Sequence, residues 1–270
     1  MSKSIESRSQ TLARVSGFWL GYLTILVMTS SLKNWVAPAW APLTWGLGSV
    51  LGLLGLTWLL LPGTRRDLVT AGRRVRHASW LRLLAGLLLG ATNLALMMWA
   101  ISTLATPLSI APSSPASGTT IALAVAGILA LATMEELGFR GYTLRELTSA
   151  FGPLRAQIVV AMAFGLTHLA YGWPWQTVLV GVIPAALLFG AAAHVSGGLA
   201  LPIGIHAGIN LARWAIGENE TPGFWVVTAA DPAQTPAEGL SALLGVAVTL
   251  ILTASLWIWH ARRKLADTVR

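Results

Sequence analysis

The chain has 270 residues, of which 55% are hydrophobic and only 10% are charged. Soluble domains carry about 25% charged residues, so this composition excludes a water-soluble globular domain and indicates an integral membrane protein. The formal net charge is +8, but the basic residues stand in short connections between apolar runs, which argues against a nucleic-acid partner. Because the chain has no cysteine, disulfides and thiolate metal sites are excluded.

Eight apolar segments predict transmembrane helices, since one helix needs roughly 20 apolar residues to cross the hydrocarbon core. In chain order they are residues 15–32, 39–62, 80–105, 119–138, 154–171, 175–194, 198–216 and 239–260. No long linker, low-complexity tract or internal repeat interrupts them. The sequence therefore predicts an all-α, polytopic bundle of about eight transmembrane helices, with residues 1–270 as a single integral membrane domain.

The distribution of lysine and arginine predicts the orientation of these helices. Basic residues gather before the first segment, in the second and fourth connections and after the last segment. Residues 106–118 carry no charge, and residues 217–238 carry acidic residues without a single Lys or Arg. Cytoplasmic loops are enriched in Lys and Arg, so we expect an even number of spans and two cytoplasmic termini, with Lys33 as the one exception.

Small residues and one amide predict how the helices pack. Three pairs of glycines stand four residues apart, which places each pair on one helix face: Gly48 and Gly52, Gly86 and Gly90, and Gly204 and Gly208. Such pairs permit close contact between helix backbones, although glycine is also simply common in this chain. Asn93, in the third segment, is expected to hydrogen-bond to a neighbouring helix.

Ionisable side chains inside the apolar segments are few, and they gather in three segments. Each one costs a few kcal/mol or more in hydrocarbon, so it usually faces a cavity or a partner. Of ten acidic residues, only Glu135 and Glu136 fall within or beside a span. Of five histidines, only His168 and His206 lie inside spans, and Asn210 follows His206 by one helical turn. These three segments are the candidate site.

Helical geometry gives each of these spacings a meaning. Glu136 and Arg140 are four residues apart with the acid first, which is the favourable order for an ion pair. Glu135 is rotated by about 100° from Glu136, so it addresses a different space. Phe164 lies one turn before His168 and could wall its imidazole.

A carboxylate, two histidines and an amide suggest hydrolysis. The carboxylate can take a proton from water, a histidine can hold that water or protonate the leaving group, and amide or imidazole donors can stabilise an oxyanion. Alternatively, Glu135, His168 and His206 could hold a divalent metal such as zinc with an open water position. Structural roles for a Glu–Arg pair and for single histidines, and a proton relay in a transporter, are further alternatives.

At these residues the sequence resembles the CPBP family of intramembrane proteases, which includes the type II CAAX prenyl endopeptidases and bacterial immunity-type relatives. The family pattern is Glu-Glu-x-x-x-Arg, then Phe-x-x-x-His, then His-x-x-x-Asn or Asp, on successive transmembrane helices. Residues 135–140, 164–168 and 206–210 match the three motifs in order. The resemblance covers approximately residues 118–216, and the first three spans carry no motif.

The resemblance implies an endopeptidase of the glutamate or metallo type that hydrolyses a peptide bond in a membrane-anchored or prenylated protein or peptide. Glu135 would activate the water with the help of His168, and His206 and Asn210 would stabilise the oxyanion. The alternative is a catalytically idle relative that acts as a binding, immunity or regulatory protein in the membrane. The expected location is the bacterial plasma membrane, with the lipid bilayer and a membrane-anchored substrate as partners.

The resemblance also implies residues that shape the site, namely Glu136, Arg140 and Phe164. One geometric difficulty accompanies this assignment. The span boundaries place Glu135 near the cytoplasmic end of its helix and His168 near the opposite end of the next. The two can meet only if the fifth helix starts outside the hydrocarbon, or if the site lies near mid-depth.

The predicted topology can be tested with reporter fusions. A reporter at residue 115 should lie on the opposite side of the membrane from a reporter at the C-terminus, because residues 106–118 carry no charge and the C-terminal segment is basic. Alkaline phosphatase and green fluorescent protein fusions report the two sides. Both reporters on the same side would contradict the orientation.

Overall fold

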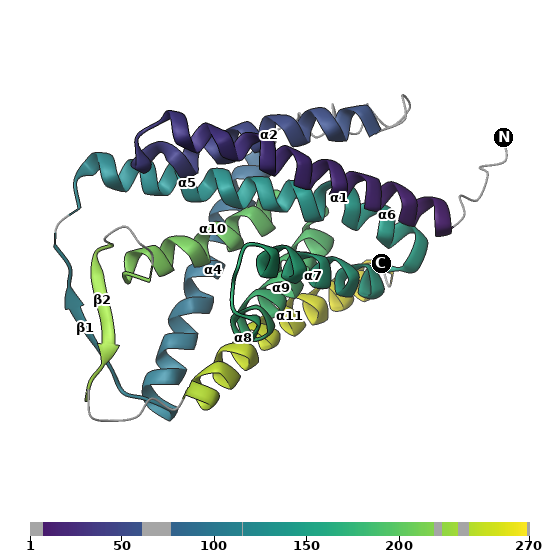
Figure 1. Ribbon diagram of the computed structural model, residues 1–270. Helices are drawn as coiled ribbons and strands as arrows, with labels where there is room; N and C mark the ends of the chain where they lie inside the picture. Colours follow the sequence, from purple (N-terminus) through teal and green to yellow (C-terminus); the bar gives the residue numbers. More distant parts are fainter. Residues whose placement is uncertain (1–7, 61–76, 115, 219–222, 232–237, 269–270) are drawn as a thin grey trace. The chain divides into compact units, whose positions relative to one another are not determined.

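The computed structural model describes residues 8–60, 77–114, 116–218, 223–231 and 238–268, and these are almost entirely helical (Figure 1). The α-helices are α1 (Arg8–Ser30), α2 (Ala41–Leu60), α4 (His77–Leu104), α5 (Gly118–Glu136), α6 (Tyr142–Phe151), α7 (Pro153–Ala170), α8 (Trp175–Thr177), α9 (Ile183–Ser196), α10 (Ala200–Ala215) and α11 (Glu238–Thr268). Turns of 3-10 helix form η1 (Ser31–Trp35) and η2 (Pro38–Trp40), and π turns form η3 (Leu137–Gly141) and η4 (Val178–Val182). The predicted all-α class is confirmed; the arginines at positions 65, 66, 73, 74 and 76 lie outside the described residues.

Seven helical segments of the described residues are long and apolar enough to cross a membrane. They are Arg8–Trp35, Pro38–Leu60, Ser79–Leu104, Gly118–Phe151, Pro153–Ala170, Trp175–Ser196 and Glu238–Thr268. Large apolar side chains such as Val27, Leu51 and Ile251 are exposed on these helices. Extensive exposed apolar surface requires lipid in place of water, so the protein is a multi-pass integral membrane protein.

The predicted span 198–216 forms a shorter helix than expected. α10 has 16 residues, which corresponds to a rise of about 24 Å, against a hydrocarbon core of about 30 Å. Much of α10 is buried, including Gly204, His206 and Gly208. A helix that other helices cover does not need to match the full thickness of the lipid, since its polar groups are enclosed by protein.

Two short strands pair outside the long helices, and the hydropathy pattern does not predict them. β1 (Leu108–Pro112) and β2 (Trp225–Ala229) form an antiparallel pair in which Leu108 lies opposite Ala229 (Figure 1). Both strands come from the connections without Lys or Arg. Because paired strands lie on one side of a membrane, the chain makes an even number of crossings between them. This favours α10 as the return crossing despite its length.

The helix of the fourth predicted span, residues 119–138, extends beyond the predicted C-terminal end. The helix starts after Ser117, whose hydroxyl accepts the Thr120 N–H at 3.1 Å as an N-cap. It then continues through η3 and α6 to Phe151, so that the helical segment is Gly118–Phe151. It ends at Gly152, which adopts a positive φ of 83° that favours glycine. The sequence analysis placed the boundary at the charged motif, but Arg140 is buried and paired, so it does not end the helix.

The described residues form two compact units, each with its own packing. The first unit comprises Met1–Trp80 and Ala122–Val160, and the second comprises Leu81–Ile121 and Ala161–Arg270. In the first unit, α1 packs along α2 and α6. In the second unit, α9 packs against both α10 and α11.

In the first unit, small residues of α2 face α1. A Cβ atom on Gly52 would lie 2.7 Å from Cγ2 of Ile25, and one on Gly48 would lie 2.8 Å from Cδ1 of Leu32 in η1. The hydroxyls of Thr29 and Ser49 share a hydrogen bond of 2.7 Å between the two helices. The predicted close contact at this glycine pair is confirmed, and it involves side chains of the partner helix.

In the second unit, the other two glycine pairs meet each other, and α4 crosses α10 backbone to backbone. A Cβ atom on Gly86 would lie 2.8 Å from Cα of Gly204. A Cβ atom on Gly90 would overlap the Ile205 carbonyl oxygen, and one on Gly208 would overlap that of Leu87. The prediction from these two pairs is confirmed. The expected hydrogen bond of Asn93 is also present, since its Nδ2 donates to Thr249 Oγ1 on α11 at 3.4 Å.

We expect Gly90→Ala to destabilise the protein. Its methyl group would meet backbone atoms of α10, and overpacking of this kind costs about 1–3 kcal/mol. Gly55→Ala is the matched control, because no atom lies within 4 Å of a Cβ at Gly55. Thermal unfolding in detergent measures both variants. Equal midpoints for Gly90→Ala and Gly55→Ala would contradict the close crossing.

Candidate active site

The first motif lies where the long helix Gly118–Phe151 widens for one turn. Glu135 and Glu136 end α5, and Arg140 lies in the π turn η3 that follows. A π turn adds one residue to the local hydrogen-bonded ring and frequently marks a functional site. It changes the angular relation between the residues before and after it. The three charged side chains of the motif therefore lie directly before the π turn or within it.

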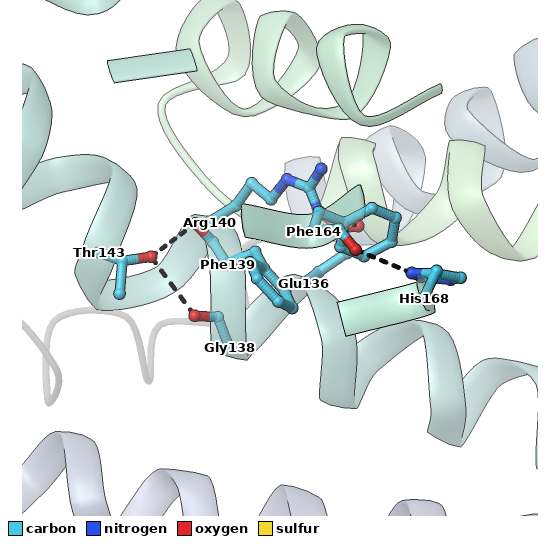
Figure 2. Close-up of polar contacts among 7 residues, drawn as sticks. All are labelled: Glu136, Gly138, Phe139, Arg140, Thr143, Phe164 and His168. Atoms are coloured by element: carbon cyan, nitrogen blue, oxygen red, sulfur yellow. Dashed lines mark hydrogen bonds and ion pairs between the residues drawn. The ribbon is translucent and has the colours of Figure 1, made fainter. Parts of the chain in front are cut away.

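The side chain of Thr143 stabilises this turn by hydrogen bonds. Its hydroxyl donates to the Phe139 carbonyl at 2.7 Å and lies 3.3 Å from the Gly138 carbonyl (Figure 2). Threonine commonly bonds back to a carbonyl one helical turn earlier, and the bond often bends the helix. Thr143 is fully buried. The sequence analysis did not find this residue, because threonine in an apolar helix has no distinctive signal.

Glu136, at the end of α5, and Arg140, in the π turn, form a buried ion pair. Arg140 Nη1 donates to Glu136 Oε1 at 3.2 Å, and both side chains have 0% relative exposure (Figure 2). The Glu135 carboxylate also interacts electrostatically with Arg140. Unlike its neighbour, however, Glu135 is only half-buried. The two adjacent glutamates therefore have different environments.

Aromatic residues of α1 pack against the helical turn that carries the first motif. The Tyr22 ring meets Phe139 edge-on at 5.2 Å, and Phe18 stacks on Tyr142 at 5.1 Å. A Cβ atom on Gly138 would lie 2.7 Å from the Tyr22 ring, so glycine is needed for this approach. The first span carries no motif, and the sequence analysis therefore missed its contribution. No local spacing relates α1 to a segment more than a hundred residues later.

His168 is oriented by two backbone contacts in the second unit. Its Nδ1 donates to the Phe164 carbonyl at 2.9 Å (Figure 2). Because a carbonyl oxygen can only accept, Nδ1 carries the proton, and in the neutral imidazole Nε2 carries the lone pair. The Trp173 N–H donates to the His168 carbonyl at 3.1 Å, and the Trp173 ring lies edge-on to the imidazole at 5.1 Å. The residue is 9% exposed.

His206 shares an aromatic neighbour with His168. The Phe164 ring lies 4.5 Å from the His168 ring and 6.2 Å from the His206 ring. Phe189 of α9 stacks on His206 at 4.5 Å with an angle of 12° between the planes. Asn210 follows one turn later on the same face of α10 and is half-buried. The second unit thus brings together the second and third motifs around Phe164.

The candidate site is divided between the two units. Glu135, Glu136 and Arg140 belong to the first unit, and the two histidine motifs belong to the second. Within neither unit do three His, Asp or Glu side chains of the described residues gather closely enough to hold a metal ion.

Phe189 and Trp173 are further residues of the site that the sequence analysis missed. Phe189 supports His206 from the neighbouring helix, and Trp173 lies in the turn directly after His168. A weak signal exists for Phe189. The chain contains only six phenylalanines, so one in the middle of a helix of small residues could have been noticed. Trp173 has no comparable signal, because tryptophan occurs 13 times.

Comparison with protein families matches residues 117–212 to the type II CAAX prenyl endopeptidase Rce1-like family. The match contains all three motifs and leaves the first three helices outside. No curated protein matches the sequence. The resemblance stated from the motifs over residues 118–216 is confirmed within these bounds. Over residues 117–212 the chain is therefore similar to the Rce1-like family of type II CAAX prenyl endopeptidases, which supports the resemblance to the CPBP intramembrane proteases.

Proposed function

We propose that this protein is an intramembrane endopeptidase of the CAAX type, in which Glu135 activates a water molecule to hydrolyse a peptide bond of a membrane-anchored protein or peptide. The observation that carries the proposal is the difference between the two adjacent glutamates. Glu136 is fully buried and bonded to Arg140, whereas Glu135 is half-buried. A general base must reach its water, so Glu135 suits this task and Glu136 suits the positioning of the turn.

Glu135 and His168 stand at nearly equal distances along the chain from the turn between their helices. The turn at Gly152 joins the helical segment Gly118–Phe151 to α7. Glu135 stands 17 residues before Gly152, and His168 stands 16 residues after it. These helix lengths are compatible with the proposed cooperation of the two residues.

His168 is proposed to hold the attacking water together with Glu135. Its Nδ1–H is occupied by the Phe164 carbonyl, so Nε2 is the nitrogen that can accept a hydrogen bond from water. Phe164 and Trp173 restrict the motion of the ring. A base held in one orientation and one tautomer loses little freedom on reaching the transition state, which favours catalysis.

His206 and Asn210 are proposed to donate hydrogen bonds to the oxyanion. They lie one turn apart on one face of α10, and the stacking of Phe189 holds the His206 ring. Donors fixed before the reaction stabilise charge that develops in the transition state, and loss of one such donor costs about 10²–10³-fold in rate. Both donors come from the helix that crosses α4 at the glycines, which is a rigid support.

The proposed reaction is the hydrolysis of one peptide bond with Glu135 as the general base. Glu135 takes a proton from water while the oxygen attacks the carbonyl carbon of the scissile bond. The resulting oxyanion accepts hydrogen bonds from His206 and Asn210. The proton then passes from Glu135 to the leaving nitrogen as the C–N bond breaks, and the two products are a carboxylate and an amine.

Zinc is the alternative way to activate the water. Glu135, His168 and His206 would be its ligands, and a bound zinc ion would lower the pKa of the water. A metal-bound histidine usually donates its second nitrogen to a carbonyl, and the contact of His168 with Phe164 fits this pattern as well. We favour the metal-free form, because the pairing of His206 with Asn210 suits two oxyanion donors and leaves fewer ligands for zinc.

Glu135→Gln should leave the protein folded and lower peptide cleavage by roughly 10²–10⁴-fold, because the amide keeps the shape of the side chain and removes the base. His168→Ala should fall in the same range. The measurement is cleavage by purified protein in detergent of fluorogenic peptides that end in CaaX sequences, with and without a farnesyl group.

Glu238→Gln is the matched control, since Glu238 is an exposed carboxylate in the first turn of α11 and should be silent. Wild-type activity that survives prolonged chelation would support the metal-free form, and loss with recovery on added zinc would support the metal. A Glu135→Gln variant at the wild-type rate would refute the proposed role. A wild-type protein that cleaves none of the peptides would favour the catalytically idle alternative.

Arg140→Ala should lower stability as well as activity. The substitution leaves the Glu136 charge buried without its partner, and breaking a buried pair in this way costs about 3–5 kcal/mol. Arg145→Ala is the control, because Arg145 is exposed on the same helix. Thermal unfolding and peptide cleavage are measured for both variants. An inactive Arg140→Ala protein with wild-type stability would point to a direct catalytic role for Arg140 instead.

A further inference from the structure

A cluster of basic side chains lies at the ends of α9 and α11 in the second unit. His194 is near the end of α9, and its ring centroid lies 5.2 Å from that of His260 and 4.7 Å from that of Trp257 on α11. The charges of His260 and Lys264 both act on His194. The proposed peptide hydrolysis uses none of these residues.

These side chains come from one face of α11 and from two other helices. Trp257, His260 and Lys264 are spaced by three and four residues, so they share the face that contacts α9. α4 adds Arg82, whose Nη1 donates to the Ser196 carbonyl at the end of α9 at 3.0 Å. Three helices therefore supply hydrogen-bond donors to one region.

No acidic side chain of the described residues pairs with this cluster. The ion pairs Glu136–Arg140 and Glu218–Arg213 lie outside the cluster. The side chains of His194, His260 and Lys264 make no hydrogen bond within the described part of the chain. Asp267, the acid nearest in sequence, is exposed near the end of α11. Arg82 and Lys264 are cations and the imidazoles carry N–H donors, so a region that offers these groups without an acidic partner favours a bound anion.

The neighbouring residues place the cluster at the level of lipid headgroups. Trp257 and Trp259 precede it on α11, and the Arg263 guanidinium lies 5.6 Å from the centroid of the Trp259 ring. Tryptophan is enriched where a helix leaves the hydrocarbon, and basic pockets between helices at this level bind anionic headgroups. We propose that the phosphate of an anionic phospholipid binds between α4, α9 and α11, with Arg82, His194, His260 and Lys264 as its donors.

Native mass spectrometry of the full chain in detergent, titrated with phosphatidylglycerol or phosphatidylcholine, tests the proposal. The wild-type protein should retain phosphatidylglycerol more tightly than phosphatidylcholine. Lys264→Gln, at an exposed position, should weaken phosphatidylglycerol binding about fivefold, as expected for one cation at a membrane surface. His260→Phe should weaken it as well, because it keeps an aromatic ring and removes an N–H donor from the same face.

Arg262→Gln is the matched control. It removes the same charge from the same helix end, but Arg262 is rotated by about 200° from His260. It should leave binding of phosphatidylglycerol unchanged. Equal weakening by Arg262→Gln and Lys264→Gln would overturn the site in favour of general surface charge. Equal retention of the two lipids, or displacement of phosphatidylglycerol by millimolar inorganic phosphate, would also overturn the assignment to a lipid headgroup.

Discussion

The buried ion pair between Glu136 and Arg140 is the interaction on which the first unit depends. Two charges without solvent exposure can persist in a membrane protein only if each compensates the other. The pair allows the helix to continue through a charged segment to Phe151 rather than end there. It also engages Glu136, as the spacing of four residues predicts, and so gives the two adjacent carboxylates different environments.

In the second unit, aromatic rings hold the histidine side chains in place. Phe164 lies beside both imidazoles, Phe189 stacks on His206, and the Phe164 carbonyl sets the tautomer of His168. Rings have few rotatable bonds and fill space firmly, so they hold neighbouring side chains at low entropic cost. The backbone crossing of α4 and α10 at the glycines adds a rigid frame for His206. The two histidine side chains are thus held in place by packing within the second unit.

Much of the candidate site can be recognised without a structure, for a physical reason. Hydrocarbon tolerates very few ionisable groups, so Glu135, His168 and His206 stand out in the spans. Helical periodicity then pairs Glu136 with Arg140, and the structure shows this pair. The supporting residues cannot be found in this way. Their importance lies in contacts between segments distant in sequence.

The sequence by itself determined the helical class, the membrane location and the three motifs, because hydropathy and residue spacing are local properties. The tertiary structure decided three further points. It placed the first motif in a π turn of a long helix, paired β1 with β2, and packed Phe164 between His168 and His206. Each of these depends on contacts between segments that are distant in the sequence or on the backbone hydrogen bonding of one turn, which no local pattern of residues encodes.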